Sequence, residues 1–127
     1  MKKLTNEIER KSTSQNGKLD VDFVLGRTDS MRVLSRKLLR EYWMREPAAE
    51  GQLKAWFAEA EQADWKDPAD VKRKYGNASI LKGERVVFNI CGNKYRLVVK
   101  INYKIRFVYV RFVGTHAEYD EIDAQTI

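Results

Sequence analysis

Four side chains in the last third of this sequence have the chemistry to hold a phosphate and to move a proton beside it. Arg96 and Arg111 carry planar guanidinium groups, which can donate two parallel hydrogen bonds to phosphate oxygens. His116 is the only histidine, and an imidazole can take or release a proton near neutral pH. Tyr119 lies close behind it and could orient the imidazole or donate a proton itself. Together these residue types suit acid–base chemistry at a phosphate.

Basic residues are concentrated in the same part of the chain. The net charge is +6, and between Lys72 and Arg111 eleven Lys and Arg residues stand against one acid, Glu84. Residues 112–127 have the opposite balance, with four acids and no Lys or Arg. A polyanion is the natural partner of a surface so basic. The alternative is an ordinary solvated surface with scattered charges.

The second half of the chain has the alternation of apolar and polar residues that is typical of β-strands. Three antiparallel strands are predicted, over residues 86–91, 94–102 and 105–113. Gly92-Asn93 between the first two is a two-residue hairpin signal. A short strand is also predicted upstream, at residues 31–35.

Helices are predicted between the upstream strand and the hairpin. They run from Ser35 to about Glu46, from about residue 49 to 63, and from Pro68 to about Gly76. Ser35 and Asp67 are the predicted N-caps. The chain is therefore predicted to be an α+β domain, a small antiparallel β-sheet with two or three helices packed on one face.

The two faces of the predicted sheet carry different side chains. Val108, Val110 and Phe112 are predicted to face the core, so that Arg111 points to the other side. Arg96 belongs to the same outer set. Such a face, with aromatic rings between the charges, can hold phosphates and stack unpaired bases. An ordinary wet sheet face is the alternative, and spacing alone does not separate the two.

The N-terminal part of the sequence differs from the rest. Residues 1–30 show no lasting periodicity and are predicted to be an N-terminal extension, either a flexible arm or an upstream extension of the reading frame. Residues 31–127 are predicted to be the folded domain. Cys91 is the only cysteine, which excludes an intramolecular disulfide and fits a reducing compartment such as the cytoplasm. The apolar runs are too short for a membrane span, and no secretory signal or metal-ligand motif is seen.

Several motifs occur in order along residues 31–127. The most specific are "RVVFNICGNKYRLVV", "VYVRFVGTH" and "HAEYD", and the helical segments "LREYW", "LKAWF" and "ADWKDPADVK" accompany them. With these motifs the chain resembles the HigB toxins, members of the RelE-like superfamily of bacterial mRNA interferases. Residues 1–30 have no counterpart in the resemblance.

The resemblance implies a toxin with a RelE-like fold that cuts mRNA, often on the translating ribosome. Cleavage in this superfamily generally needs no metal or cofactor, because the ribose 2′-OH attacks the neighbouring phosphate and leaves a cyclic phosphate. The resemblance also implies a HigA-type helix-turn-helix antitoxin encoded beside the toxin. No membrane partner is expected.

The resemblance also assigns roles to residues. Arg96 matches the arginine of the "YRL" motif, Arg111 the basic position at the end of the last strand, and His116 and Tyr119 the "THxEYD" segment, which makes these four the predicted catalytic residues. Which residue is the base and which the acid stays open. Six further residues are predicted to bind RNA: Asn89, Asn93, Lys94, Lys100, Lys82 and Arg85.

Two other functions compete with the nuclease. A non-catalytic RNA-binding module would use the same basic face, with the histidine as a surface or capping residue, the commoner role of a lone histidine. A DNA-binding repressor fits less well, because no helix has the basic face of a recognition helix. The exposed faces of the helices are instead predicted to be acidic and not to bind RNA directly, on account of Glu41, Glu46, Glu59, Glu61 and Asp64.

Overall fold

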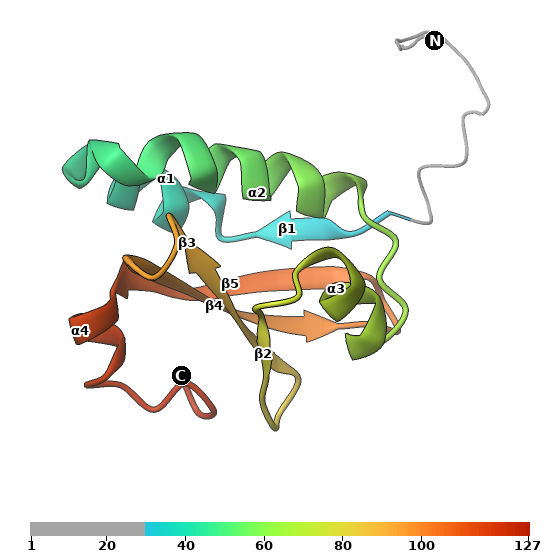
Figure 1. The fold of residues 1–127 in the computed structure, drawn as a ribbon. Helices are drawn as coiled ribbons and strands as arrows, with labels where there is room; N and C mark the ends of the chain where they lie inside the picture. The colour runs from blue at the N-terminus through green and yellow to red at the C-terminus, as the bar shows by residue number, and fades with distance from the viewer. Residues whose placement is uncertain (1–29) are drawn as a thin grey trace, which may run out of the picture. The chain divides into compact units, whose positions relative to one another are not determined.

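The structure is a computed structural model that describes residues 30–127 (Figure 1). The elements run in the order β1 (Arg32–Leu34), α1 (Arg36–Arg45), a 3₁₀ turn (Pro47–Ala49), α2 (Glu50–Gln62), α3 (Pro68–Lys74), β2 (Ser79–Ile80), β3 (Arg85–Ile90), β4 (Tyr95–Asn102), β5 (Phe107–Thr115) and α4 (His116–Tyr119). The predicted α+β class is confirmed. The predicted N-terminal extension lies outside the described residues, apart from Ser30, and stays a prediction.

Within residues 30–127 the chain forms a five-stranded sheet in the order β1-β5-β4-β3-β2. Strands β2 to β5 pair antiparallel, which confirms the predicted hairpins, whereas β1 pairs parallel to β5. The sheet is therefore mixed. A parallel pair needs a long crossover between its strands, and the helices that lie between β1 and β5 in sequence supply it.

The core lies between the sheet and the helices. In Figure 1, α1 and α2 cover one face of the sheet. Four alternate side chains of β4 are fully buried there: Tyr95, Leu97, Val99 and Ile101. Phe88 of β3 is almost fully buried and contacts three other rings, at centroid distances of 5.4 Å to Trp56, 6.2 Å to Trp65 and 5.0 Å to Tyr75.

One of the two predicted helix caps is confirmed and the other is wrong. The Asp67 side chain accepts a hydrogen bond of 3.0 Å from the backbone N–H of Asp70, and Pro68 occupies the first helical position. Ser35 precedes α1 in a left-handed conformation, with φ of 70°, and its side chain caps nothing. An N-cap side chain needs extended backbone to reach the first turn, and the sharp bend out of β1 prevents this.

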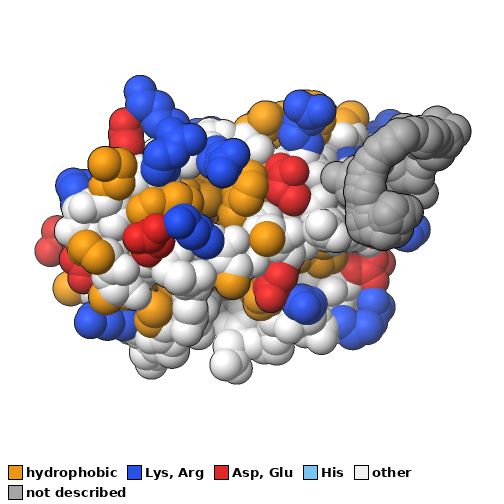
Figure 2. Space-filling view, turned by 90° about the horizontal axis from the view of Figure 1, so that it is seen from above, with side chains coloured by type: hydrophobic (Ala, Val, Ile, Leu, Met, Phe, Trp, Pro, Cys, Tyr) orange, Lys and Arg blue, Asp and Glu red, His pale blue; other side chains and the backbone are white. Residues whose placement is uncertain are grey.

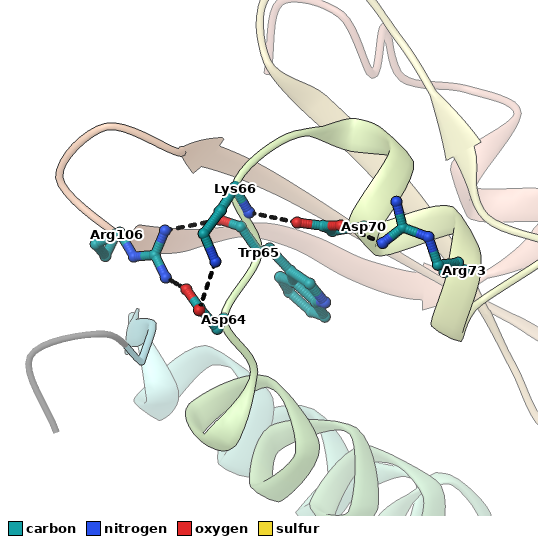
Figure 3. Close-up of polar contacts among 6 residues, drawn as sticks. All are labelled: Asp64, Trp65, Lys66, Asp70, Arg73 and Arg106. Atoms are coloured by element: carbon teal, nitrogen blue, oxygen red, sulfur yellow. Dashed lines mark hydrogen bonds and ion pairs between the residues drawn. The ribbon is translucent and has the colours of Figure 1, made fainter. Parts of the chain in front are cut away.

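A polar network holds the segment between α2 and α3 against the β4–β5 turn (Figure 3). Arg106 forms an ion pair with Asp64 and donates a hydrogen bond of 3.3 Å to the Trp65 carbonyl oxygen. Lys66 pairs with Asp64 at 2.7 Å, and its backbone N–H donates to Asp70 at 2.9 Å. The network joins residues far apart in sequence and fixes the backbone from which the buried Trp65 ring enters the core.

A hydrogen bond between β4 and the end of α1 makes the free energy of unfolding fall at alkaline pH. The Tyr95 hydroxyl donates to Glu46 Oε2 at 2.6 Å, and this bond together with burial raises the pKa of Tyr95 to about 12. An unfolded tyrosine titrates near ~10, so the unfolded state loses its proton first as the pH rises. The contribution of this hydrogen bond to the free energy of unfolding should therefore be constant up to about pH 10 and be lost between about pH 10 and 12.

We expect Tyr95→Phe to unfold at lower urea concentration at pH 7 and to lose less stability between pH 10 and 12 than the unchanged chain. Part of the alkaline fall should persist, because burial also raises the pKa of Tyr103 to about 12. Urea unfolding curves at several pH values measure both effects. Tyr109→Phe, on the outer face of β5, is the matched control. An alkaline fall of the same size in Tyr95→Phe would contradict the assignment.

Candidate functional site

A β-bulge in β5 determines which side chains face away from the helices. The pairing between β4 and β5 shifts at Val98 and Val99, and the extra residue of β5 is Arg111. Because a bulge shifts the alternation by one residue, the predicted core position of Phe112 is wrong. Phe112 packs on the outer face, and Val113 takes its place in the core. Arg111 keeps its predicted outer position.

The sequence predicted that the outer face of the sheet is a basic surface. In the structure, part of this face is covered by another segment of the chain. After α4 the chain passes over the side of the sheet opposite α1 and α2 (Figure 1). There it forms a second apolar cluster in which Val87, Val98 and Ala124 are buried. The partly buried members of this cluster are Leu81, Phe112, Tyr119, Ile122 and Ile127. The C-terminal segment, residues 122–127, therefore covers the middle of the outer face.

One end of the outer face brings together several predicted site residues. Arg96 of β4 pairs in register with Asn89 of β3 on one side and with Gly114 of β5 on the other. Its guanidinium carbon lies 5.9 Å from the centroid of the Tyr119 ring. Its Nη1 donates a hydrogen bond of 3.2 Å to the carbonyl oxygen of Asn93. We refer to Asn89, Asn93, Arg96, His116 and Tyr119 as the Arg96 cluster.

Helix α4 positions the histidine of this cluster through a capping box. The Thr115 hydroxyl accepts the backbone N–H of Glu118 at 3.1 Å, and the Glu118 carboxylate accepts the backbone N–H of Thr115 at 2.8 Å. The backbone N–H of His116 donates to the Lys94 carbonyl oxygen at 3.1 Å, which ties α4 to the β3–β4 turn. His116 Nδ1 lies 3.1 Å from Asp120 Oδ2, and this contact holds the ring from the Nδ1 side.

Sequence reasoning missed the residues that position α4. The pattern Thr115-x-x-Glu118 is a capping-box signature and could have predicted the helix start at His116. Gly114 had no sequence signal. A Cβ atom there would lie 2.6 Å from Glu118 Oε1 and 2.7 Å from Phe112 Cζ. The contact between β5 and α4 therefore requires glycine.

Arg111 lies apart from the Arg96 cluster. Its Nε donates a hydrogen bond of 3.3 Å to the backbone oxygen of Ile127, and Arg85 of β3 donates to the same oxygen. Arg111 precedes Gly114, the partner of Arg96, by three residues, which corresponds to roughly 10 Å along a strand. The structure therefore brings the side chains of Arg96 and Tyr119 together and places Arg111 elsewhere. His116 lies on the same short helix as Tyr119, with its ring against Asp120.

The other predicted RNA-binding lysines have different surroundings. Lys100 is on the outer face of β4, paired in register with Arg85 and Tyr109. Lys94 is exposed in the β3–β4 turn, with its Nζ 5.6 Å from the Tyr95 ring centroid, and Lys82 is exposed between β2 and β3. The register thus places Lys100 on the outer face, whereas the Lys94 amine lies against a core ring and Lys82 is known only to be exposed.

The basic residues of the outer face have no carboxylate partners within residues 30–127. The cations that form ion pairs in this part of the chain are Lys37, Lys54, Lys66, Arg73, Arg106 and His116. None of Lys82, Arg85, Lys94, Arg96, Lys100 and Arg111 is among them. None of these six positive charges is therefore paired with an Asp or Glu side chain of residues 30–127, although Arg85 and Arg111 both donate to the Ile127 oxygen.

The helical side of the molecule has a different composition. Figure 2 views this side, on which basic, acidic and hydrophobic side chains are interspersed. Three of the acids predicted to lie exposed there hold the fold, since Glu46 and Glu59 accept hydrogen bonds from tyrosine hydroxyls and Glu61 accepts one from the backbone of β1. Basic residues without acidic partners also occur on this side, since Arg36, Arg40 and Arg45 of α1 form no ion pair with an acid among residues 30–127.

Neither a cluster of metal-ligating side chains nor a membrane-spanning helix occurs in the described part of the chain. No group of three or more His, Cys, Asp or Glu side chains that could hold a metal ion occurs among residues 30–127. None of the helices described is both long enough and apolar enough to cross a membrane.

Comparison with known families identifies the class of protein. Residues 49–122 match a family described as the RelE-like toxic component of a toxin-antitoxin system. The match spans more than half of the chain and contains β2 to β5 and the Arg96 cluster, so the chain is a RelE-like toxin with an antitoxin as its implied partner. It belongs to the HigB toxin family. No curated protein matches the chain.

Proposed function

We propose that this toxin is an endoribonuclease that cuts mRNA at the Arg96 cluster. The observation that carries the proposal is the position of an arginine without a carboxylate partner beside an aromatic ring and a histidine-bearing helix. Arg96 would hold the scissile phosphate, and the ring of Tyr119 would support the adjacent ribose or base. The family membership supports the same reading, because the chain is a RelE-like toxin.

The chemistry follows from the residues present. The ribose 2′-OH attacks the adjacent phosphorus, the bond to the 5′ oxygen of the next nucleotide breaks, and a cyclic phosphate remains. Negative charge grows on the phosphate oxygens during attack, and the fixed guanidinium of Arg96 stabilises it. His116 Nε2 either takes the 2′-OH proton or protonates the leaving 5′ oxygen. Asp120, on Nδ1, holds the ring in orientation.

The proposal also concerns partners and location. The substrate is proposed to be mRNA on the translating ribosome, in the cytoplasm. The Arg96 cluster contains no candidate general base other than His116. The ribosome would therefore align the RNA at this cluster. The antitoxin is proposed to be of the HigA type, a helix-turn-helix protein.

An RNA with one modified ribose tests the reaction directly. We expect the purified toxin, with ribosomes present and no added transition metal, to cut a short mRNA and to leave a cyclic phosphate. A matched mRNA with a 2′-deoxy nucleotide at the cut position should stay intact there, because the attacking group is missing. Gel analysis of end-labelled RNA and mass spectrometry of the fragments measure both results.

The same experiment separates the competing function. A non-catalytic RNA-binding module would bind the RNA without cutting it and would arrest translation equally with either RNA. The combined variant Arg96→Ala/His116→Ala, if it stays folded, should neither cut mRNA nor arrest growth. Continued growth arrest by this variant would contradict the catalytic reading.

A further inference from the structure

The turn between β3 and β4 holds two members of the Arg96 cluster through its backbone. The carbonyl oxygen of Asn93 accepts the hydrogen bond of 3.2 Å from Arg96 Nη1. The next carbonyl oxygen, that of Lys94, accepts the backbone N–H of His116 at 3.1 Å. The positions of the guanidinium and of the start of α4 therefore both depend on the conformation of this turn.

The backbone of this turn has a conformation that needs support. Cys91 and Gly92 follow each other with positive φ angles of 54° and 66°. Glycine adopts such angles freely, whereas a residue with a Cβ atom is strained there. The left-handed conformation of Cys91 is therefore kept only where neighbouring groups hold the backbone in place.

A side chain of the helical layer holds the backbone at this position. Gln52, the third residue of α2, accepts the backbone N–H of Cys91 with its Oε1 atom at 2.7 Å. The two residues are 39 positions apart in sequence. The Cys91 thiol makes a second contact with the helical layer, since its Sγ lies 3.6 Å from the carbonyl oxygen of Ala48. The turn is thus tied to the start of α2 on one side and to α4 on the other.

We propose that Gln52 is a positioning residue of the nuclease, which acts through the β3–β4 turn on Arg96 and His116. The inference rests on the proposed function, because it gives these two residues a supporting group for the reaction assigned to them. Without the acceptor on Gln52, the N–H of Cys91 loses its partner and the strained turn relaxes. The carbonyl oxygens that hold the guanidinium and the start of α4 then move with it.

Single-turnover cleavage of a ribosome-bound mRNA tests the inference with the full chain. Gln52→Leu keeps the bulk of the side chain and loses the acceptor, so it should cut roughly tenfold to 100-fold more slowly, since a misplacement of about 1 Å can cost that much. The ribosome concentration that gives half of the maximal rate should change little, because Gln52 does not belong to the Arg96 cluster. Gln52→Glu keeps an acceptor oxygen and should restore most of the rate. Gln62→Leu makes the same exchange at the other end of α2 and should cut at the normal rate.

The coupling through the turn can be measured without any cleavage. In amide NMR spectra of Gln52→Leu, the proton signals of the Cys91 and His116 amides should both move upfield, since each hydrogen bond is lost or lengthened. The His116 signal is the decisive one, because this amide is bonded to Lys94 and responds to Gln52 only through the turn. Both signals should stay in place in Gln52→Glu and Gln62→Leu. Gln52 is exposed, and circular dichroism checks that each variant is folded.

The outcomes separate this inference from the proposed function. The inference is overturned if the His116 amide signal stays in place in Gln52→Leu, or if this variant cuts mRNA at the normal rate. It is also overturned if Gln52→Glu cuts as slowly as Gln52→Leu, because the acceptor oxygen would then be irrelevant. A shifted His116 signal in Gln52→Leu, with no cleavage by the unchanged chain, would instead support the coupling through the turn and count against the proposed nuclease.

Discussion

Alanine in place of Arg96 should lower the rate of mRNA cleavage about 100-fold or more, by analogy with the loss of one fixed charge stabiliser at other active sites. In the proposed reaction the guanidinium would face the phosphate on which charge accumulates in the transition state. The fold should survive, because Arg96 is only partly buried and makes its hydrogen bonds to nearby backbone oxygens. Single-turnover cleavage of a ribosome-bound mRNA measures the rate, and growth after induced expression gives a second reading.

Two matched variants sharpen this prediction. Arg96→Lys keeps the charge and loses the planar pair of donors, so its rate should lie between those of the unchanged chain and Arg96→Ala. Arg73→Ala removes an arginine of α3 that pairs with Asp70, and it should cut at the normal rate. A normal rate in Arg96→Ala, with Arg111→Ala inactive, would move the catalytic centre to Arg111.

Phe88→Ala should have the largest effect on stability, a loss of about 3–5 kcal/mol, as is typical when a fully buried phenylalanine is truncated. Phe88 contacts the rings of Trp56, Trp65 and Tyr75, which come from α2, the segment before α3 and the end of α3. The cavity would therefore loosen the packing of both helices on the sheet at once. Thermal unfolding followed by circular dichroism should show a fall in Tm of at least about 12 °C for a domain of this size.

A conservative change provides the comparison. Phe88→Leu keeps most of the apolar volume, so its loss of stability should be clearly smaller than that of Phe88→Ala. Phe107→Ala truncates a partly buried ring on the outer face of β5, at the far end from α4, and should also cost less. Equal losses in Phe88→Ala and Phe107→Ala would mean that the three-ring contact does not dominate the core.

The order and kind of most elements could be predicted from local sequence. The alternation of apolar and polar residues predicted β3, β4 and the start of β5. The pair Asp67-Pro68 predicted the beginning of α3. These signals are local, because an element that buries one face shows its own period in the sequence. The cap at Ser35 failed for the opposite reason, since the bend between β1 and α1 is set by packing and not by the serine.

The candidate site could be predicted only in part. Arg96 was placed correctly on the outer face by its spacing within β4, and His116 and Tyr119 by their position after the last strand. The separation of Arg111 from Arg96 could not be predicted from the sequence. The bulge at Arg111, which moves Phe112 outward, arises from the pairing of β5 with β4. A bulge has no reliable local pattern here, as both Arg111 and Phe112 fit a regular strand.

The sequence by itself determined a basic α+β domain whose candidate phosphate-binding residues lie mostly on strands, and its motifs indicated the toxin family that the comparison then confirmed. Only the tertiary structure decided which of those residues meet. It joined Arg96 to α4, paired Arg85 with Arg111, and laid residues 122–127 between the two groups. The physical reason is that strand period fixes the face of a side chain, whereas register, bulges and chain return fix its neighbours.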